Sequence, residues 1–401
     1  MNKIILLTCS IILLLLLNCK LAISQNSEQK PIELKLIPFS EIILPKEIIS
    51  SNVKIGGISG AFYEKDSSII RTISDDNKGD VHGYDFNIEL IKAPNIKFEL
   101  NFLREFSIKS NKKFRICDSE DIDRDIYGYE YVVSEGCIDN STLSNIEAGI
   151  FKVRKYGSTE RRISSEVKTS LRFTKRIENN FGFEALCYEV DSNKKELLVT
   201  ANESALKRDD TPASFIKGSL IRIARFSRYE PKAPFIKEKE FAYEISSIPQ
   251  AKLNRKDDIF LAINGLVDIL ALGNNRYLTL ERAAILYSDT KSKDKIIDQM
   301  EFSIRIFEID LNAAYDVSED KFLSIIDKSR ITTKRLVLDL SSPEVLDQIS
   351  KDIPSSKRID NFESLSYGPL LPNGNPSLIL FADDNFNPIE NNLVLFLELL
   401  K

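Results

Sequence analysis

A plan that repeats along the chain limits what this sequence can fold into. Each copy has a short strand with a polar residue near its start, a turn, and a strongly apolar strand that ends in acid. In one copy, residues 183–188 are followed by residues 197–200 and Glu203. The polar residues that open the copies are Ser59, Glu120, Glu184, Asn264 and Glu363. Repeated units of short strands are typical of β-propeller blades.

Further strands are predicted between the copies, at residues 150–154, 220–223 and 303–307, where basic and apolar residues alternate. Such alternation indicates a strand with one wet face. The interval from Asn264 to Glu363 is long enough to contain one degenerate copy. The sequence therefore predicts an all-β fold, a β-propeller with six blades of four antiparallel strands.

The two ends of the predicted propeller are expected to meet. Residues 393–399 form a last apolar strand, which we expect to complete a blade begun near residues 33–45. This closure would leave no free edge between the first and last blades. Helical periodicity is scarce, and the best helix candidate, at residues 342–349, is short.

The N-terminus, residues 1–24, resembles an export signal, with an apolar stretch too short for a comfortable membrane span. Two processing sites remain open: cleavage after Ser24, or a lipobox that leaves Cys19 as a lipidated first residue. No later segment is apolar enough to cross a bilayer. We therefore expect residues 25–401 to form one exported domain, which is periplasmic, secreted or lipid-anchored.

Few cysteines and one histidine restrict the chemistry. Because export favours oxidation, Cys117 and Cys137, which flank a candidate strand pair, are predicted to form a disulfide. Cys187 lies in an apolar strand and is expected to be a buried thiol, with a three-cysteine metal site as the alternative. The single His82 excludes an HExxH zinc site and leaves one possible base for a Ser-His-Asp triad.

The net charge of −5 is mild, and nucleic-acid binding requires concentrated lysine and arginine. We therefore expect no nucleic-acid partner. The expected ligand is a small-molecule ester or another anionic compound, and the protein is expected to be a monomer.

Acidic residues recur where each copy closes. Equivalent points of successive blades face one axis, so these acids and the opening polar residues should surround one region. Like charges raise each other's pKa, and calcium accepts six to eight oxygen ligands, so a calcium site is predicted there. Arg282 could instead neutralise a neighbour or hold an anionic group. The alternative is that each acid occupies an ordinary wet turn.

These positions give two sets of candidate site residues. The candidate metal ligands are Asp75, Asp76, Glu120, Glu135, Glu281, Asp383 and Asp384. The candidate catalytic residues are Glu184, Glu203, Glu363 and Arg282.

The segments ISGAFYEKDSSIIRTISDD, LTLER and NFESLSYGPLLPNGNPSLILFADDNF are among those that resemble the motifs of the phytase-like family, "esterase-like activity of phytase". The resemblance covers residues 52–400 and implies an exported bacterial propeller with hydrolase activity. Propeller phytases bind calcium ions that hold substrate phosphates. The family's acidic motif positions correspond here to Glu120, Glu135, Glu184, Glu203, Glu281, Glu363, Asp383 and Asp384. Ser59 and Asn264 depart from the acidic pattern.

Three functions follow as hypotheses. The first is a calcium-assisted hydrolase of phosphate esters, in which a carboxylate acts as general base. The second is a propeller that binds a ligand or scaffolds a cell-surface complex without turnover, since propellers host many functions. The third is a carboxylesterase, which would depend on Ser59 and His82. Metal-dependent turnover would separate the first hypothesis from the second.

Overall fold

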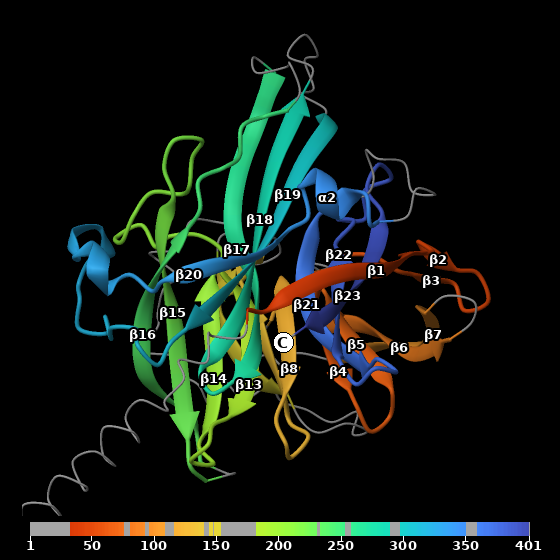
Figure 1. Cartoon of the computed structure of the whole chain (residues 1–401), viewed down its shortest axis with the longest axis horizontal. Coiled ribbons are helices and arrows are strands. Elements are labelled where there is room, and N and C mark those ends of the chain that lie inside the picture. Colours follow the sequence, from red (N-terminus) through yellow and green to blue (C-terminus); the bar gives the residue numbers. More distant parts are fainter. Residues whose placement is uncertain are drawn as a thin grey trace, which may run out of the picture. The chain divides into compact units, whose positions relative to one another are not determined.

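The structure is a computed structural model of the 401-residue chain. It describes residues 33–75, 81–92, 96–108, 116–139, 144–146, 148–153, 182–230, 233–252, 258–288, 297–349 and 359–400. Within the compact unit Leu36–Leu400, antiparallel strands form a series of small sheets (Figure 1).

The sheets are the blades of a propeller. Blade 1 contains β4 (Ile58–Glu64), β5 (Ile69–Ser74), β6 (Val81–Ile91) and β7 (Lys97–Ile108). Blade 2 contains β8 (Ser119–Arg124), β9 (Glu130–Ser134) and β12 (Gly149–Val153). Blade 3 contains β13 (Phe183–Val190), β14 (Glu196–Asn202), β15 (Ser219–Arg228) and β16 (Ile236–Ile245). Blade 4 contains β17 (Ile259–Gly273), β18 (Arg276–Ser288), β19 (Ile297–Asp310) and β20 (Lys334–Asp339). Blade 5 contains β21 (Phe362–Leu370), β22 (Pro376–Ala382), β23 (Asn392–Leu400) and β1 (Lys35–Leu44).

The blades close into a ring through their first strands. The strand β4 contacts β8, β8 contacts β13, β13 contacts β17, β17 contacts β21, and β21 contacts β4 again. All of these inner strands line one cavity of about 140 Å³. The prediction that the two ends of the chain share a blade is confirmed, because β1 pairs with β23. The strand β1 forms the outer edge of blade 5, so the two ends of the chain are joined by backbone hydrogen bonds within one sheet.

The predicted β-propeller is confirmed, but the prediction of six blades is wrong: the described residues form five. The described residues between Asn264 and Glu363 form no additional blade. This interval is occupied by long strands, since β17 has 15 residues, β18 has 13 and β19 has 14. These strands run side by side in blade 4 (Figure 1). Strand length, and not strand number, accounts for the interval.

Strands predicted at residues 150–154, 220–223 and 303–307 correspond to β12, β15 and β19, each the third strand of its blade. Short accessory elements complete the described fold. They are the hairpins β2 (Glu47–Ile48) with β3 (Val53–Lys54) and β10 (Cys137–Asp139) with β11 (Ser144–Ile146), the 3₁₀ turns η2 (Leu323–Ile325) and η3 (Lys328–Arg330), and α2 (Pro343–Leu346). The helix α2 lies within the segment predicted to be helical, with Pro343 in its first turn, where a missing N–H costs nothing.

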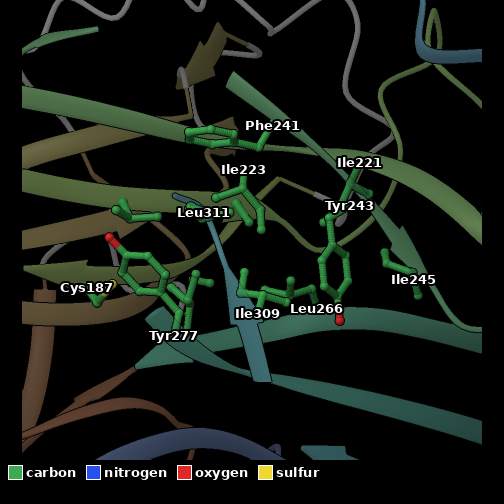
Figure 2. Packing of buried hydrophobic residues seen from close by; sticks show 14 of the residues in the cluster. Cys187, Ile221, Ile223, Phe241, Tyr243, Ile245, Leu266, Tyr277, Ile309 and Leu311 are labelled. Carbon is green, nitrogen blue, oxygen red and sulfur yellow. The ribbon is translucent and has the colours of Figure 1, made fainter. Parts of the chain in front are cut away.

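The hydrophobic core lies between the faces of adjacent blades. Between blades 3 and 4, Ile223, Phe241 and Tyr243 pack with Leu266 and Tyr277 (Figure 2). The propeller is therefore held together by apolar contacts between sheets, and the inner strand ends are left to carry polar groups.

A disulfide joins Cys117 and Cys137, whose Cα atoms are 6.0 Å apart. Cys187 is a buried free thiol on β13. Cys19 lies outside the described residues. None of the helices in the described part of the chain is long and apolar enough to cross a membrane.

Candidate functional site

Each inner strand contains a β-bulge, near its start in four blades and in the middle of β17 in blade 4, and the bulge places one side chain at the same point of every blade. In blade 2, Ser119 pairs with Ser134 and the next pair is Asp121 with Val133, so Glu120 is the extra residue. A bulge leaves its extra residue outside the ladder and re-aims its side chain. The equivalent residues are Ser59, Glu120, Glu184, Val267 and Glu363.

This register corrects the alignment of blade 4. The sequence analysis placed Asn264 at the opening position, but Val267 occupies it, because the pair Leu266–Glu281 is followed by Asp268–Leu280. Asn264 lies earlier in β17, opposite Ala283, and its Nδ2 donates to the carbonyl of Ser246 at 2.7 Å. In the other blades the opening residue is polar, so the polar Asn264 was selected and the apolar Val267 was not.

The second strand of each blade supplies the closing position. In four blades this residue follows the strand, and its backbone N–H donates to a carbonyl before the inner strand, as from Glu203 to Gly182 at 3.0 Å and from Asp383 to Asn361 at 2.9 Å. In blade 4, Leu266 pairs with Glu281. The next residue, Arg282, holds the equivalent position and pairs with Gly265. The closing residues are Asp75, Glu135, Glu203, Arg282 and Asp383.

The acids at these opening and closing positions come together, and we call them the carboxylate ring. Its members are Asp75, Glu120, Glu135, Glu184, Glu203, Glu363 and Asp383. One oxygen from each of Glu135, Glu184 and Glu203 lies within 4.8 Å of the others, and the same holds for Asp118, Glu120 and Glu135. Glu135 belongs to both groups.

Arg282 is the guanidinium that faces the ring. Its Nη2 donates to Oε1 of Glu363 at 2.6 Å and lies 3.2 Å from Oε1 of Glu203. Nε of Arg282 and Oε1 of Glu203 are both buried, and neither has a hydrogen-bond partner among the described residues. The contact with Glu203 is therefore an ion pair without hydrogen-bond geometry.

Burial and mutual repulsion raise the pKa values of the ring carboxyls. Burial raises the pKa of Glu135 to about 8, and the charges of Glu203 and Asp118 add to the increase. Burial also raises the pKa of Glu203 to about 7, against the opposing effect of Arg282. The pKa values of Glu120 and Glu184 are raised well above the ordinary range by burial and then by neighbouring carboxylates. Each of these carboxyls therefore holds its proton up to a higher pH than an ordinary glutamate does.

The donor set fits a hard cation. Carboxylate oxygens are the ligands that calcium prefers, and each group of three acids brings its oxygens close enough to share one ion. Oε1 of Glu203 is buried and accepts no hydrogen bond among the described residues, although Arg282 lies 3.2 Å away, so this oxygen can take a further ligand. The residues that could hold a cation are therefore Asp118, Glu120 and Glu135, or Glu135, Glu184 and Glu203.

Two predicted metal ligands lie elsewhere. Glu281 is fully buried beside the ring, but it accepts a hydrogen bond from Tyr243 at 2.7 Å and one from Lys334, and Arg305 lies 3.7 Å away. Because successive residues of a strand face opposite sides, Glu281 points away when Arg282 points to the ring. Asp384 is bound by Lys46 at 3.1 Å and by the backbone N–H of Gly57 at 3.2 Å.

The remaining predicted site residues lie at the carboxylate ring, with one exception. Four predicted metal ligands and three candidate catalytic residues belong to the ring, and the fourth candidate catalytic residue, Arg282, contacts it: Asp75, Glu120, Glu135, Asp383, Glu184, Glu203 and Glu363 are the members. Asp76 lies outside the described residues.

Sequence reasoning missed acids that stand just before or after the bulge. Asp118 has a left-handed backbone, φ 59°, and its carboxylate joins Glu120 and Glu135. Asp121 and Asp268 each follow a bulge and accept a backbone N–H from the inner strand of the next blade, Leu186 at 2.7 Å and Leu365 respectively. The signal for Asp121 in the sequence was its place directly after the opening residue Glu120, whereas Asp268 follows Val267, which the sequence did not mark as an opening residue.

The groups needed by a carboxylesterase are not paired in the described part of the chain. The hydroxyl of Ser59 donates to the carbonyl of Gly57 at 3.5 Å. His82 lies on β6, opposite Ser74 and Ser107, with Nδ1 3.9 Å from Glu105. A Ser59–His82 pair therefore receives no support.

Comparisons with known proteins were made for the sequence and for the fold. A search of curated proteins finds no match. Among solved structures, an endo-arabinase from Bacteroides thetaiotaomicron has 10% identity and a TM-score of 0.41, over 88% of this chain and 96% of that chain. A thermostable family-43 glycoside hydrolase has 11% identity and a TM-score of 0.39, over 86% of this chain and 89% of that chain. Similarities this low carry no argument about activity.

The match to a protein family is decisive. The phytase-like family model, described as "Esterase-like activity of phytase", matches residues 53–386, which include blades 1 to 4, the strands β21 and β22 of blade 5, and the whole carboxylate ring. The resemblance noted in the sequence is thereby confirmed. The chain belongs to the phytase-like family of β-propellers.

Proposed function

We propose that this phytase-like propeller is a hydrolase of phosphate esters, assisted by calcium held in the carboxylate ring. The proposal rests on the position of Glu135. Its carboxylate lies within 4.8 Å of oxygens of Asp118 and Glu120, and also within 4.8 Å of oxygens of Glu184 and Glu203. The family description, which refers to esterase-like activity, supports hydrolysis of an ester. A calcium ion bound there would supply positive charge that stabilises the charge developing on a phosphoryl group.

A cation explains how an acidic site could accept an anionic substrate. Without a bound cation, the carboxylates of the ring would repel a phosphate ester. Arg282 could not offset this repulsion, because its guanidinium is already engaged by Glu203 and Glu363. With Asp118, Glu120 and Glu135 around a cation, the ring loses much of this repulsion. In this proposal Arg282 keeps Glu203 and Glu363 in position.

Glu203 is suited to the role of general base. A base works best when its pKa lies near the working pH, and the pKa of Glu203 is raised to about 7. Its Oε1 is free of hydrogen bonds among the described residues. We propose that this oxygen accepts a proton from water as the water oxygen bonds to phosphorus and the bond between phosphorus and the ester oxygen breaks. The proton then passes to the departing alcohol or to solvent, which restores the carboxylate beside Arg282, 3.2 Å away.

The test combines stability with turnover. The purified protein should melt at a higher temperature in calcium than in EDTA, because an ion that binds only the folded state stabilises it. Hydrolysis of p-nitrophenyl phosphate should require calcium, while p-nitrophenyl acetate should not be hydrolysed. The variant Glu135→Gln should lose most of the calcium-induced shift, whereas Asp384→Asn, an acid bound by Lys46, should keep it.

The outcomes separate the hypotheses. Calcium stabilisation without turnover would favour a ligand-binding propeller over an enzyme. Hydrolysis of the acetate ester in EDTA would favour a carboxylesterase. The absence of both a calcium shift and turnover would overturn the proposed function.

A further inference from the structure

A second polar cavity lies on the opposite side of β18 from Arg282, away from the carboxylate ring. It has a volume of about 330 Å³, which is within the size range of small-molecule sites. Its walls come from the segment 247–252 after blade 3, from β18 and β19, and from residues 339–341 at the end of β20. The strands β18 and β19 that form its base are paired over their whole length (Figure 1).

Two cationic residues, Lys252 and Arg305, line this cavity, and Arg305 lies on the strand β19 that forms its base. Its Nη2 donates to the carbonyl of Ser247 at 3.2 Å, and its Nε is buried without a hydrogen-bond partner among the described residues. Nη2 of Arg305 also lies 3.7 Å from Oε2 of Glu281, and the carboxylate of Glu281 is bound by Lys334 and Tyr243 as well. The cross-strand neighbours of Arg305 are Glu281 on β18 and Asp339 on β20. Because its Nε has no hydrogen-bond partner among the described residues, the guanidinium of Arg305 keeps a donor for another anion.

Hydroxyl groups beside Arg305 complete a set of donors. Ser341 Oγ lies 3.2 Å from Ser303 Oγ, and both serines line the cavity. When Ser341 donates to Ser303, the hydroxyl hydrogen of Ser303 is left to donate to a bound group. Arg305 and Ser303 stand two residues apart on β19, so both side chains face the same side of the strand.

The acids of the cavity are already occupied, but they limit the charge of a ligand. Glu301 accepts hydrogen bonds from Tyr287 Oη at 2.6 Å and from the backbone N–H of Lys252 at 2.8 Å. Asp339 accepts from the backbone N–H of Ser341 at 2.8 Å. Their charges remain, and they disfavour a dianion such as phosphate more than a monoanion.

Apolar groups form the rest of the lining, among them Ala283, Ile285 and Phe302. A ligand that satisfies the whole cavity needs one anionic end and an apolar body. We propose that this cavity binds a small monocarboxylate, with Arg305 and Ser303 as donors to its carboxylate. This site is separate from the proposed phosphate-ester site, since none of the carboxylate ring lines it.

The test uses benzoate as the probe, with the full chain, in EDTA and measured by isothermal titration calorimetry. Benzoate should bind, and benzamide, which has the same shape without the charge, should bind at least about tenfold more weakly. Inorganic phosphate should bind more weakly than benzoate. Tighter binding of phosphate, or equal affinity for benzoate and benzamide, would overturn the proposal, as would the absence of benzoate binding at millimolar concentrations.

Variants locate the site. Arg305→Met should weaken benzoate binding at least about tenfold, because a charged hydrogen bond is lost. Ser303→Ala, which leaves the ion pair with Glu281 intact, should weaken it severalfold and serves if Arg305→Met fails to fold. The control is Arg276→Met on β18, since Arg276 pairs with Glu308 outside the cavity and its loss should leave binding unchanged. Unchanged binding in Ser303→Ala and Arg305→Met would place benzoate elsewhere and refute the assignment.

Discussion

Arg282 donates a hydrogen bond from Nη2 to Oε1 of Glu363 at 2.6 Å, and the two residues come from neighbouring blades, 81 positions apart in the chain. The contact links blade 4 to blade 5 at the carboxylate ring. Arg282 holds the position that an acid holds in every other blade. The fold therefore places the guanidinium of Arg282 beside the carboxylate ring, at the closing position of blade 4.

Replacing Arg282 should destabilise the protein. The variant Arg282→Met removes the partner of two buried carboxylates, and loss of one partner of a buried ion pair costs about 3–5 kcal/mol. We expect the free energy of unfolding, measured with urea in EDTA, to fall by about this amount. The control is Arg330→Met, at a half-buried ion pair with Asp320, whose loss should cost less than the loss of Arg282. Equal stability of both variants would show that the ring does not need Arg282.

The stability of the metal-free protein should fall as the pH rises. The pKa values of Glu135 and Glu203 in the folded state, about 8 and about 7, lie above the ordinary value of 4.5. Between pH 4.5 and these raised pKa values, the folded state binds more protons than the unfolded state. The stabilising contribution of the two groups is therefore fully present below about pH 4.5 and is lost as the pH rises towards 8. Each group contributes up to about 1.4 kcal/mol per pH unit.

Urea unfolding in EDTA at a series of pH values measures this effect. The variant Glu135→Gln removes one of the raised groups, so its free energy of unfolding should decrease less between about pH 5 and pH 8 than that of the wild type. Parallel curves for the two proteins would contradict a raised pKa at Glu135.

Gly60 should not tolerate a side chain. A Cβ at this position on β4 would lie 2.5 Å from the Cα of Asp121 on β8, and backbone cannot move aside as a flexible side chain can. We expect Gly60→Ala to lower the free energy of unfolding by about 1–3 kcal/mol, the usual cost of overpacking. Gly149→Ala, whose new Cβ would meet only Phe151 at 3.6 Å, is the matched control and should be tolerated. A stable Gly60→Ala protein would mean that the inner strands of blades 1 and 2 are less tightly packed than described.

The disulfide should contribute to stability by restricting the unfolded chain. Cys117 and Cys137 are 20 positions apart, and closing a loop of this size stabilises a protein by about 3 kcal/mol. We expect the double variant Cys117→Ala, Cys137→Ala to show this loss in urea unfolding. Dithiothreitol should destabilise the wild type and leave the double variant unchanged. A wild type that is insensitive to reduction would argue against the bond.

The repeat of apolar strands that end in acid was enough to predict a β-propeller and its closure by the two ends of the chain. It was also enough to select Glu120, Glu135, Glu184, Glu203 and Glu363 as neighbours, because equivalent positions of blades face one axis. The number of blades was not predictable. A long interval in sequence can contain another blade or longer strands, and blade 4 contains the latter.

What the tertiary structure decided is the register of blade 4. Its bulge falls at Val267, three residues beyond Asn264, and because Val267 is apolar it lacks the polar side chain that marks the opening position in the other blades. A shift of one residue in a strand exchanges its two faces, so whether Glu281 or Arg282 joins the ring depended on strand pairing alone. The sequence by itself determined that carboxylates would gather at the axis. Only the folded chain decided that an arginine would stand among them, because side-chain direction follows from the backbone hydrogen bonds between strands and not from residue type.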